Sequence, residues 1–400
     1  MRRRWTARGA AIAVGLVLLW GGSGVGVYLF LGAHRSDLAR KAARPNESTA
    51  SVNPALARLP GTLFLAQEGA LYRLQRGRFT TVLGAAGWAQ PAALPGGQGL
   101  VLVKRDPSGF SDLYRMSNGG RPEPLTQDQG QGAVQGRDPG GQLVTQYWAM
   151  YPRASADGAQ LYFATDRYKH VRCCPFDVTM RVAQMPLSGG TPKFWTVDAV
   201  TPTDTHTEDG DYAGGDAEPV PLKSGAVMFV RYAHVGSEIG SELLLLKQAR
   251  GTPVPLTALQ DHCSEPALSA DGSKVAMICS YGKQTTSLEV AAFDGTSLGP
   301  RTIVISGVQA AQPTWSPDGS QLVFLAPVGM TGHFQLWSIT APSSLATPKP
   351  APTPAGRGRT PTPSTPSTAP VPPSAAALPP PIQLTDNLDF DATSPIVWTS

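Results

Sequence analysis

The sequence predicts an all-β fold, a six-bladed β-propeller that is closed by its own chain ends and preceded by one transmembrane helix. Three observations lead to this prediction: a repeated proline-to-glycine spacing, strand-like runs after each copy, and an incomplete unit at each end of the repeats. With 400 residues, of which 41% are hydrophobic and 16% charged, the chain is long enough to bury a substantial core.

The composition of the N-terminal region predicts a membrane anchor. A basic tail over residues 1–8 precedes an uncharged apolar stretch over residues 9–33. Crossing a bilayer takes about 20 apolar residues, and arginines ahead of such a span favour a cytoplasmic N-terminus. We therefore expect a signal-anchor in the cell membrane, with the bulk of the chain extracytoplasmic. A cleaved signal peptide ending near Gly32-Ala33 is the alternative, and the polar residues 34–59 predict a flexible stalk.

The formal net charge of +4 is concentrated at this end of the chain. Up to Lys41 there are seven Lys or Arg residues against one Asp, which leaves 26 basic and 28 acidic residues for the remainder. A basic surface of the kind that binds nucleic acid is therefore not expected.

The repeat consists of a proline followed six residues later by a glycine. Its copies begin at Pro91, Pro152, Pro219, Pro266 and Pro313, and the last three are spaced 47 residues apart. A short apolar run follows each glycine, which predicts two strands joined by a tight turn in which glycine adopts positive φ. Further alternating runs complete four antiparallel strands per unit, as in a propeller blade.

The two ends of the repeat region supply one further blade. Residues 63–83 hold three strands of a blade that lacks its first strand, and residues 394–398 provide that strand. Pairing them closes a ring over residues 60–400 and leaves neither end as an open edge. Spacings of 61 and 67 residues between the first three copies leave room for long loops or, as the less favoured alternative, a degenerate seventh blade.

The best copies of the repeat, residues 151–158, 265–272 and 312–319, resemble the WD40-like repeats of TolB-like propellers, as do Thr165-Asp166-Arg167 and the Leu-Thr endings. The resemblance spans about residues 61–400. It implies the propeller fold and leaves function open, because such propellers serve as protein-binding platforms, as gates on peptidases and as parts of lyases. The separate N-terminal domain of TolB has no counterpart here, so membership of the TolB–Pal envelope system is not implied.

An acidic stretch ahead of Pro219 is the strongest candidate for metal binding. It comprises Asp204, His206, Glu208, Asp209, Asp211 and Asp216. Closely spaced carboxylates bind Ca²⁺ through oxygen ligands, but this spacing does not match an EF-hand. We expect a solvated acidic loop, keep a Ca²⁺ site as the alternative, and expect no other cofactor.

The cysteines predict structural roles. Cys263 and Cys279 lie equally far from Asp271 at a predicted hairpin turn, so an antiparallel register places them opposite each other. Outside the cytoplasm such a pair can form a disulfide. For the adjacent Cys173 and Cys174 we favour a vicinal disulfide, while pairing with another chain and metal binding as thiolates stay open.

We expect no catalytic role for two further segments. The pattern Gly295-Thr-Ser297-Leu-Gly299 matches a nucleophile motif, but it follows Asp294 in a predicted hairpin and no helix follows it, so we expect a β-turn. Residues 341–381 carry 14 of the 38 prolines and predict a disordered loop inserted within one blade. The insertion is either a spacer or an arm toward a cell-wall polymer or partner domain.

Together these observations predict a binding or scaffolding module and not an enzyme. We expect a protein or cell-envelope glycan to bind at one propeller face. The alternative is a metal-dependent hydrolase or lyase that uses the acidic loop on one face.

Overall fold

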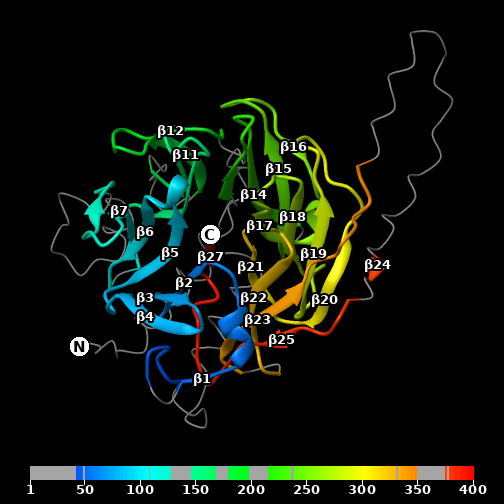
Figure 1. Cartoon of the computed structure of the whole chain (residues 1–400). Coiled ribbons are helices and arrows are strands. Elements are labelled where there is room, and N and C mark those ends of the chain that lie inside the picture. The colour runs from blue at the N-terminus through cyan, green and yellow to red at the C-terminus, as the bar shows by residue number, and fades with distance from the viewer. Residues whose placement is uncertain are drawn as a thin grey trace, which may run out of the picture.

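The computed structural model describes residues 42–47, 50–107, 109–127, 146–167, 179–197, 215–235, 238–329, 332–348, 374–375 and 378–400. In these residues, six sheets of four or five strands surround a common centre (Figure 1). The prediction of an all-β, six-bladed propeller is therefore confirmed.

Each blade is a meander whose first strand lies at the centre and whose last strand lies at the periphery. Blade 1 consists of β5 (Trp88–Ala93), β6 (Gly99–Arg105), β7 (Ser111–Ser117) and β8 (Glu123–Pro124). Blade 2 consists of β9 (Ala149–Ala154), β10 (Gln160–Thr165), β11 (Arg181–Pro186) and β12 (Lys193–Phe194). Blade 3 consists of β13 (Gly215–Pro221), β14 (Val227–Val235), β15 (Glu238–Leu246) and β16 (Val254–Pro255).

The remaining blades follow the same plan. Blade 4 consists of β17 (Cys263–Leu268), β18 (Lys274–Cys279), β19 (Thr286–Ala292) and β20 (Thr302–Val308), to which β24 (Ser374–Ala375) adds a fifth strand. Blade 5 consists of β21 (Ala311–Trp315), β22 (Gln321–Pro327), β23 (Phe334–Thr340) and β25 (Ile382–Gln383). Blade 6 consists of β27 (Val397–Thr399), β2 (Thr62–Gln67), β3 (Ala70–Gln75) and β4 (Arg78–Leu83).

The core lies between neighbouring blades, because the middle strands are apolar on both faces. In β10, Leu161 and Phe163 pack against blade 1, whereas Tyr162 between them packs with Phe229 of blade 3. Successive side chains of a strand point to opposite faces. A blade packed on both sides therefore needs the near-continuous apolar runs that follow each repeat glycine.

The Asp-Gly turns between the first and second strands are held by the aspartate side chain. In blade 4, Ser269 Oγ donates to Asp271 Oδ1 at 2.6 Å, and the backbone N–H of Ser273 donates to the same oxygen at 3.0 Å. Hydrogen bonds from Ser269 and Ser273 hold the pKa of Asp271 well below its usual value. The same serine-to-aspartate bond recurs between Ser155 and Asp157 and between Ser316 and Asp318. Local turn chemistry thus accounts for this part of the repeat.

The two chain ends meet in blade 6, as predicted. Strand β27 pairs antiparallel with β2, with Leu63 opposite Trp398. The Trp398 indole N–H donates to the Pro60 carbonyl at 2.6 Å. At Gly61 a side chain is excluded, since a Cβ there would lie 2.0 Å from the Thr399 carbonyl oxygen.

The flexible stalk predicted for residues 34–59 is wrong for its described part, residues 42–47 and 50–59. Strand β1 (Ser51–Val52) pairs with β26 (Thr385–Asp386), and the short helix η2 (Pro54–Arg58) follows it (Figure 1). Leu56 is 1% exposed. The polar composition conceals a few apolar side chains that pack on the junction of blades 5 and 6.

The predicted tail and anchor, residues 1–8 and 9–33, and stalk residues 34–41 lie outside the described residues. Within the part of the chain that the structure describes, no helix is long and apolar enough to cross a membrane.

The closed ring yields a first prediction. Deleting residues 394–400 removes β27, and with it the strand pairing that joins the two chain ends. We expect the midpoint of thermal unfolding, followed by circular dichroism, to fall by on the order of 10 °C or more, because several kcal/mol of packing and hydrogen bonding are lost. Deleting the exposed Ser400 alone is the control and should leave the midpoint unchanged. A truncated chain that melts like the intact one would contradict ring closure.

Candidate functional site

The first strand of five blades carries the same backbone irregularity, directly ahead of the repeat proline. The residue there has positive φ in every case: Gln90 (46°), Tyr151 (54°), Glu218 (52°), Glu265 (56°) and Gln312 (51°). The register with the second strand shifts at the same point, as in a β-bulge. Proline is compatible with a bulge because it has no N–H to contribute to the ladder.

Residues other than glycine seldom adopt positive φ, so neighbouring groups must stabilise it. For four of the five, Gln90, Tyr151, Glu265 and Gln312, a hydrogen bond from the backbone N–H to a side chain of the preceding blade does so. The N–H of Tyr151 donates to Gln90 Oε1 at 2.8 Å, which links blades 1 and 2. The N–H of Glu265 donates to Glu218 Oε2 at 2.6 Å, and the N–H of Gln312 donates to Glu265 Oε2 at 2.5 Å.

Blade 6 joins this series through a serine. Ser394 Oγ accepts the N–H of Gln90 at 2.7 Å, and Gln312 Nε2 donates to the Ala392 carbonyl at 3.0 Å. We call the six residues the inner ring: Gln90, Tyr151, Glu218, Glu265, Gln312 and Ser394. Both partners of blade 6 come from the C-terminal segment, so the inner ring includes the blade in which the chain ends meet.

Two carboxylates give the inner ring its electrostatic character. Burial and, to a lesser extent, the nearby charge of Glu218 raise the pKa of Glu265 to about 8, although the N–H of Gln312 opposes the shift. Burial also raises the pKa of Glu218, although the Tyr232 hydroxyl donates to its Oε1 at 2.6 Å. The charge of Arg153 lowers the pKa of Glu218, and burial lowers the pKa of Arg153 itself. The pair therefore holds a proton more readily than free glutamates do.

Carboxyls with raised pKa values are candidates for acid–base chemistry. Here, however, Oε2 of both Glu218 and Glu265 accepts a backbone N–H from the next blade. Their local geometry is that of a structural bond between blades.

Blade 4 contains a second buried polar cluster, beside a disulfide. Cys263 lies opposite Cys279 in the register of β17 and β18, and the two are bonded, as predicted. Arg301 Nη1 lies 3.2 Å from Cys263 Sγ, and Nη2 donates to Asp261 Oδ2 at 2.8 Å. Arg301 Nε also lies 3.6 Å from Oε2 of the fully buried Glu289. The Arg301 guanidinium thus connects Asp261, ahead of β17, with Glu289 of β19 beside the disulfide.

Most predicted site residues lie outside the described residues. They are the metal candidates Asp204, His206, Glu208, Asp209 and Asp211 and the cysteines Cys173 and Cys174. In the described residues, no group of three or more His, Cys, Asp or Glu side chains is placed to hold a metal ion.

Two of the motifs do lie in the described structure. Asp216 is fully buried and accepts two bonds from Arg231, at 2.7 and 3.0 Å, so it belongs to an ion pair and not to the solvated loop with which its sequence position grouped it. Ser297 Oγ donates to Asp294 Oδ2 at 2.9 Å, and the N–H of Thr296 donates to Oδ1 at 2.8 Å. The motif forms a bend between β19 and β20 that the side chain of Asp294 holds.

The inner ring was not predicted from the sequence, although a signal for it is present. The residue ahead of each repeat proline is large and polar: Gln, Tyr, Glu, Glu and Gln in chain order. Such residues at one register of otherwise apolar strands indicate a shared hydrogen-bonding role.

No protein-family model and no curated protein sequence matches the chain at a significant level. Among solved structures, it is similar to TolB from Acinetobacter baumannii (15% identity, TM-score 0.48), covering 72% of this chain and 63% of that one. A putative TolB from Agrobacterium tumefaciens (16% identity, TM-score 0.45) matches over 70% and 85% of the two chains. A gluconolactonase from Xanthomonas campestris (12% identity, TM-score 0.41) matches over 75% and 85%. At this level these are similarities of fold, and they carry no argument about function.

The raised pKa of Glu265 yields a second prediction. The folded protein keeps a proton that the unfolded chain, with a pKa near 4.5, has lost, so the free energy of unfolding falls as pH rises from about 4.5 through about 8. Glu265→Gln removes this titration, and its amide oxygen can still accept the Gln312 N–H. We expect melting curves with a shallower pH dependence and a midpoint at pH 8 that is higher by on the order of 2–5 °C.

The matched control is Glu123→Gln, an exposed residue of β8 that should change neither the slope nor the midpoint. A Glu265→Gln variant that melts at a lower temperature than the parent at pH 8 would rule out a protonated Glu265 in the folded state.

Proposed function

We propose that this chain is a membrane-anchored, extracytoplasmic propeller that acts as a binding or scaffolding module for a protein or a cell-envelope glycan. The proposal rests on the observation that the inner ring holds the blades together. Its carboxylates and amides bond blade to blade, so recognition falls to the surfaces and loops at the ends of the blades.

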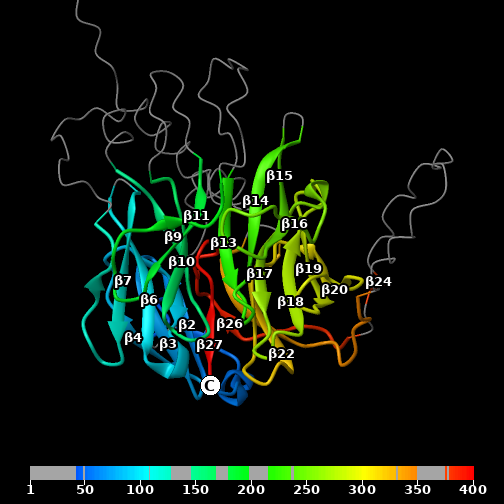
Figure 2. The same ribbon diagram turned by 90° about the horizontal axis from the view of Figure 1, so that it is seen from above.

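One end of the propeller collects long connections. In each antiparallel blade, the first and third strands start at one end of the propeller, and the second and fourth strands finish at that same end. We call this end the loop end. Residues 128–145, 168–178 and 198–214 join β8 to β9, β10 to β11 and β12 to β13, and each connects strand ends on this side. The strands of blades 2 and 3 stand side by side in Figure 2, so their like ends share one side of the molecule. Segments that connect the strands of a rigid scaffold are typical binding elements.

The N-terminal segment reaches the same end. The N–H of Ala43 donates to the Asn387 carbonyl at 2.8 Å, and Gln67 Nε2, beside the β2–β3 turn, donates to the Ala43 carbonyl at 2.9 Å. Residues 34–41 separate this point from the expected anchor. Extended, eight residues span about 30 Å. The loop end would then face the membrane, which favours a partner at or near the bilayer surface.

The second candidate is the metal-dependent hydrolase or lyase. It is supported by the sequence, in which Asp209 and Asp211 fall between β12 and β13.

The anchor yields the third prediction. We expect the full chain to stay in the membrane pellet after alkaline carbonate extraction, and a chain that starts at residue 42 to be released. The apolar stretch over residues 9–33 holds the full chain in the bilayer. N-terminal sequencing of the full-length product should find the original N-terminus. Release of the full-length product from the membrane by carbonate, or a new N-terminus near Ala33, would instead indicate a cleaved signal peptide.

The fourth prediction separates the two functions. A binding module should capture the same partner from cell-envelope fractions, after crosslinking and pull-down, with Asp209→Asn/Asp211→Asn as with the parent chain. A metal-dependent enzyme should instead lose a chelator-sensitive activity in this variant. Asp386→Asn, an exposed site on β26, is the control for nonspecific charge effects. Failure of the parent chain to capture any envelope protein or glycan would count against the binding role.

A further inference from the structure

The proline-rich insertion interrupts blade 5, but both of its ends rest on blade 4. Just after β23, Leu345 packs against the core between blades 4 and 5, and Leu378 packs against the same core on the return. The crossing is close, because a Cβ at Gly299 would lie 2.3 Å from the Ala346 carbonyl oxygen. The insertion is therefore attached to the neighbouring blade at both ends.

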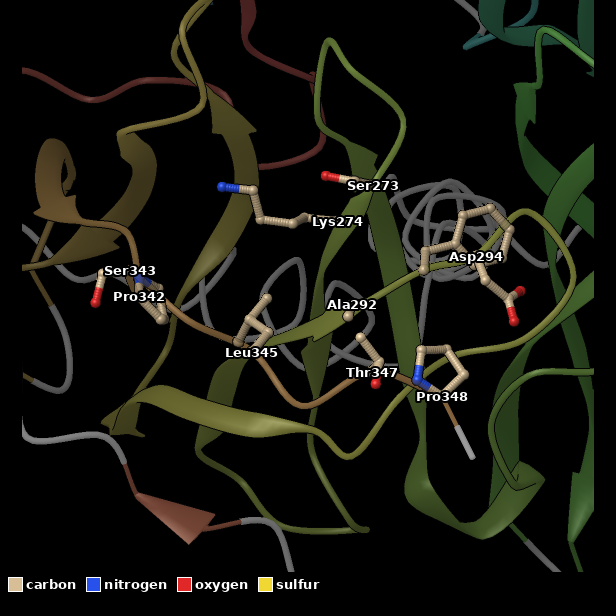
Figure 3. Close-up of a pocket in the computed structure, with 10 residues that line it drawn as sticks. Ser273, Lys274, Ala292, Asp294, Pro342, Ser343, Leu345, Thr347 and Pro348 are labelled. Carbon is tan, nitrogen blue, oxygen red and sulfur yellow. The ribbon is translucent and has the colours of Figure 1, made fainter. Parts of the chain in front are cut away.

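The first crossing borders an open pocket of about 390 Å³ between residues 342–348, the start of β18 and the end of β19 (Figure 3). Its charged groups serve other partners. Lys274 Nζ points away to the Gly319 carbonyl at 3.1 Å, and Asp294 holds its own turn. We assign no ligand to this pocket.

The return crossing is more informative, because it adds a strand to the outer edge of blade 4. Strand β24 runs parallel to β20, with Ser374 opposite Thr302 and Ala375 opposite Ile303. In the sequence, residues 374–378 form a proline-free island between Pro372-Pro373 and three further prolines. Proline has no backbone N–H, so pairing by this part of the insertion is limited to the island.

Strand β20 differs from most other outer strands. The outer strands β8, β12, β16 and β25 are two residues long, whereas β20 has seven residues, Thr-Ile-Val-Ile-Ser-Gly-Val, without a charge. A long, uncharged, β-branched edge strand is a template for strand addition. The β24 ladder covers two of its seven positions.

We propose that β24 is an edge guard: it keeps the outer edge of blade 4 from pairing with β20 of a second copy of this chain. An antiparallel pair of β20 strands satisfies the two-fold symmetry of a homodimer. It places no like charges opposite each other, because the strand has none. The insertion thus sets the oligomeric state through one short backbone ladder.

The test is Ser374→Pro/Ala375→Pro in the full chain, solubilised in detergent. The substitutions remove both N–H groups of β24 while leaving the length of the insertion unchanged. Sedimentation equilibrium should show at least a tenfold tighter dimer than for the parent chain, and Ala375→Pro alone should give a smaller shift in the same direction. The control is Thr368→Pro/Ala369→Pro in the same insertion, which should behave as the parent.

A second change locates the interface. Ser306 is exposed on β20, and Ser306→Lys places one positive charge from each copy near the two-fold axis. Added to the double proline variant, it should restore the monomer. The proposal fails if the proline variant folds with an unchanged melting curve and stays monomeric, or if its dimer persists with Ser306→Lys.

Discussion

The structure depends on a hydrogen bond that is repeated at four of the six junctions between blades, from the backbone N–H of one blade to the side chain of the blade before it. The residue that forms this bond has positive φ and a polar side chain. It is followed by a proline, which has no N–H to contribute to the ladder. Each such bond contributes about 0.5–1.5 kcal/mol net. Its larger effect is geometric, since it sets the offset at which the apolar blade faces meet.

The fold was predictable from the sequence because its determinants are local and periodic. The Asp-Gly turns, the apolar runs and the equal distances of Cys263 and Cys279 from Asp271 each involve one hairpin. The split blade followed from counting strands at the two ends. The inner ring escaped prediction, because positive φ at a residue such as Glu265 depends on a neighbour 47 residues away. The stalk was misjudged for a similar reason: Ala43 and Leu56 are ordinary residues until the blade surface that they contact is known. The acidic loop and Cys173-Cys174 remain predictions.

Among the described residues, four of the six buried carboxylates, Asp216, Glu218, Asp261 and Glu289, belong to blades 3 and 4. Glu218, Glu265 and Tyr232 lie toward the centre, and Arg301, Asp261 and Glu289 lie beside the disulfide. Replacing such networks by apolar side chains often costs little stability. Their value is specificity, because the hydrogen bonds of Glu218, Glu265 and Asp261 form in one register of the strands. In a ring built from similar blades, that selectivity helps exclude arrangements shifted by one residue.

The segment that precedes β2 has a mechanical consequence. It runs along the junction of blades 5 and 6 from Ala43, beside the β2–β3 turn, to Leu59, near the opposite end of the blade. A force applied on the N-terminal side of residue 42 would load the bonds of Ala43 and the short β1–β26 ladder before it reached the seam between β2 and β27. The pairing of β2 with β27, where the two ends of the ring meet without a covalent link, is thereby protected from tension by the contacts of the segment that precedes β2.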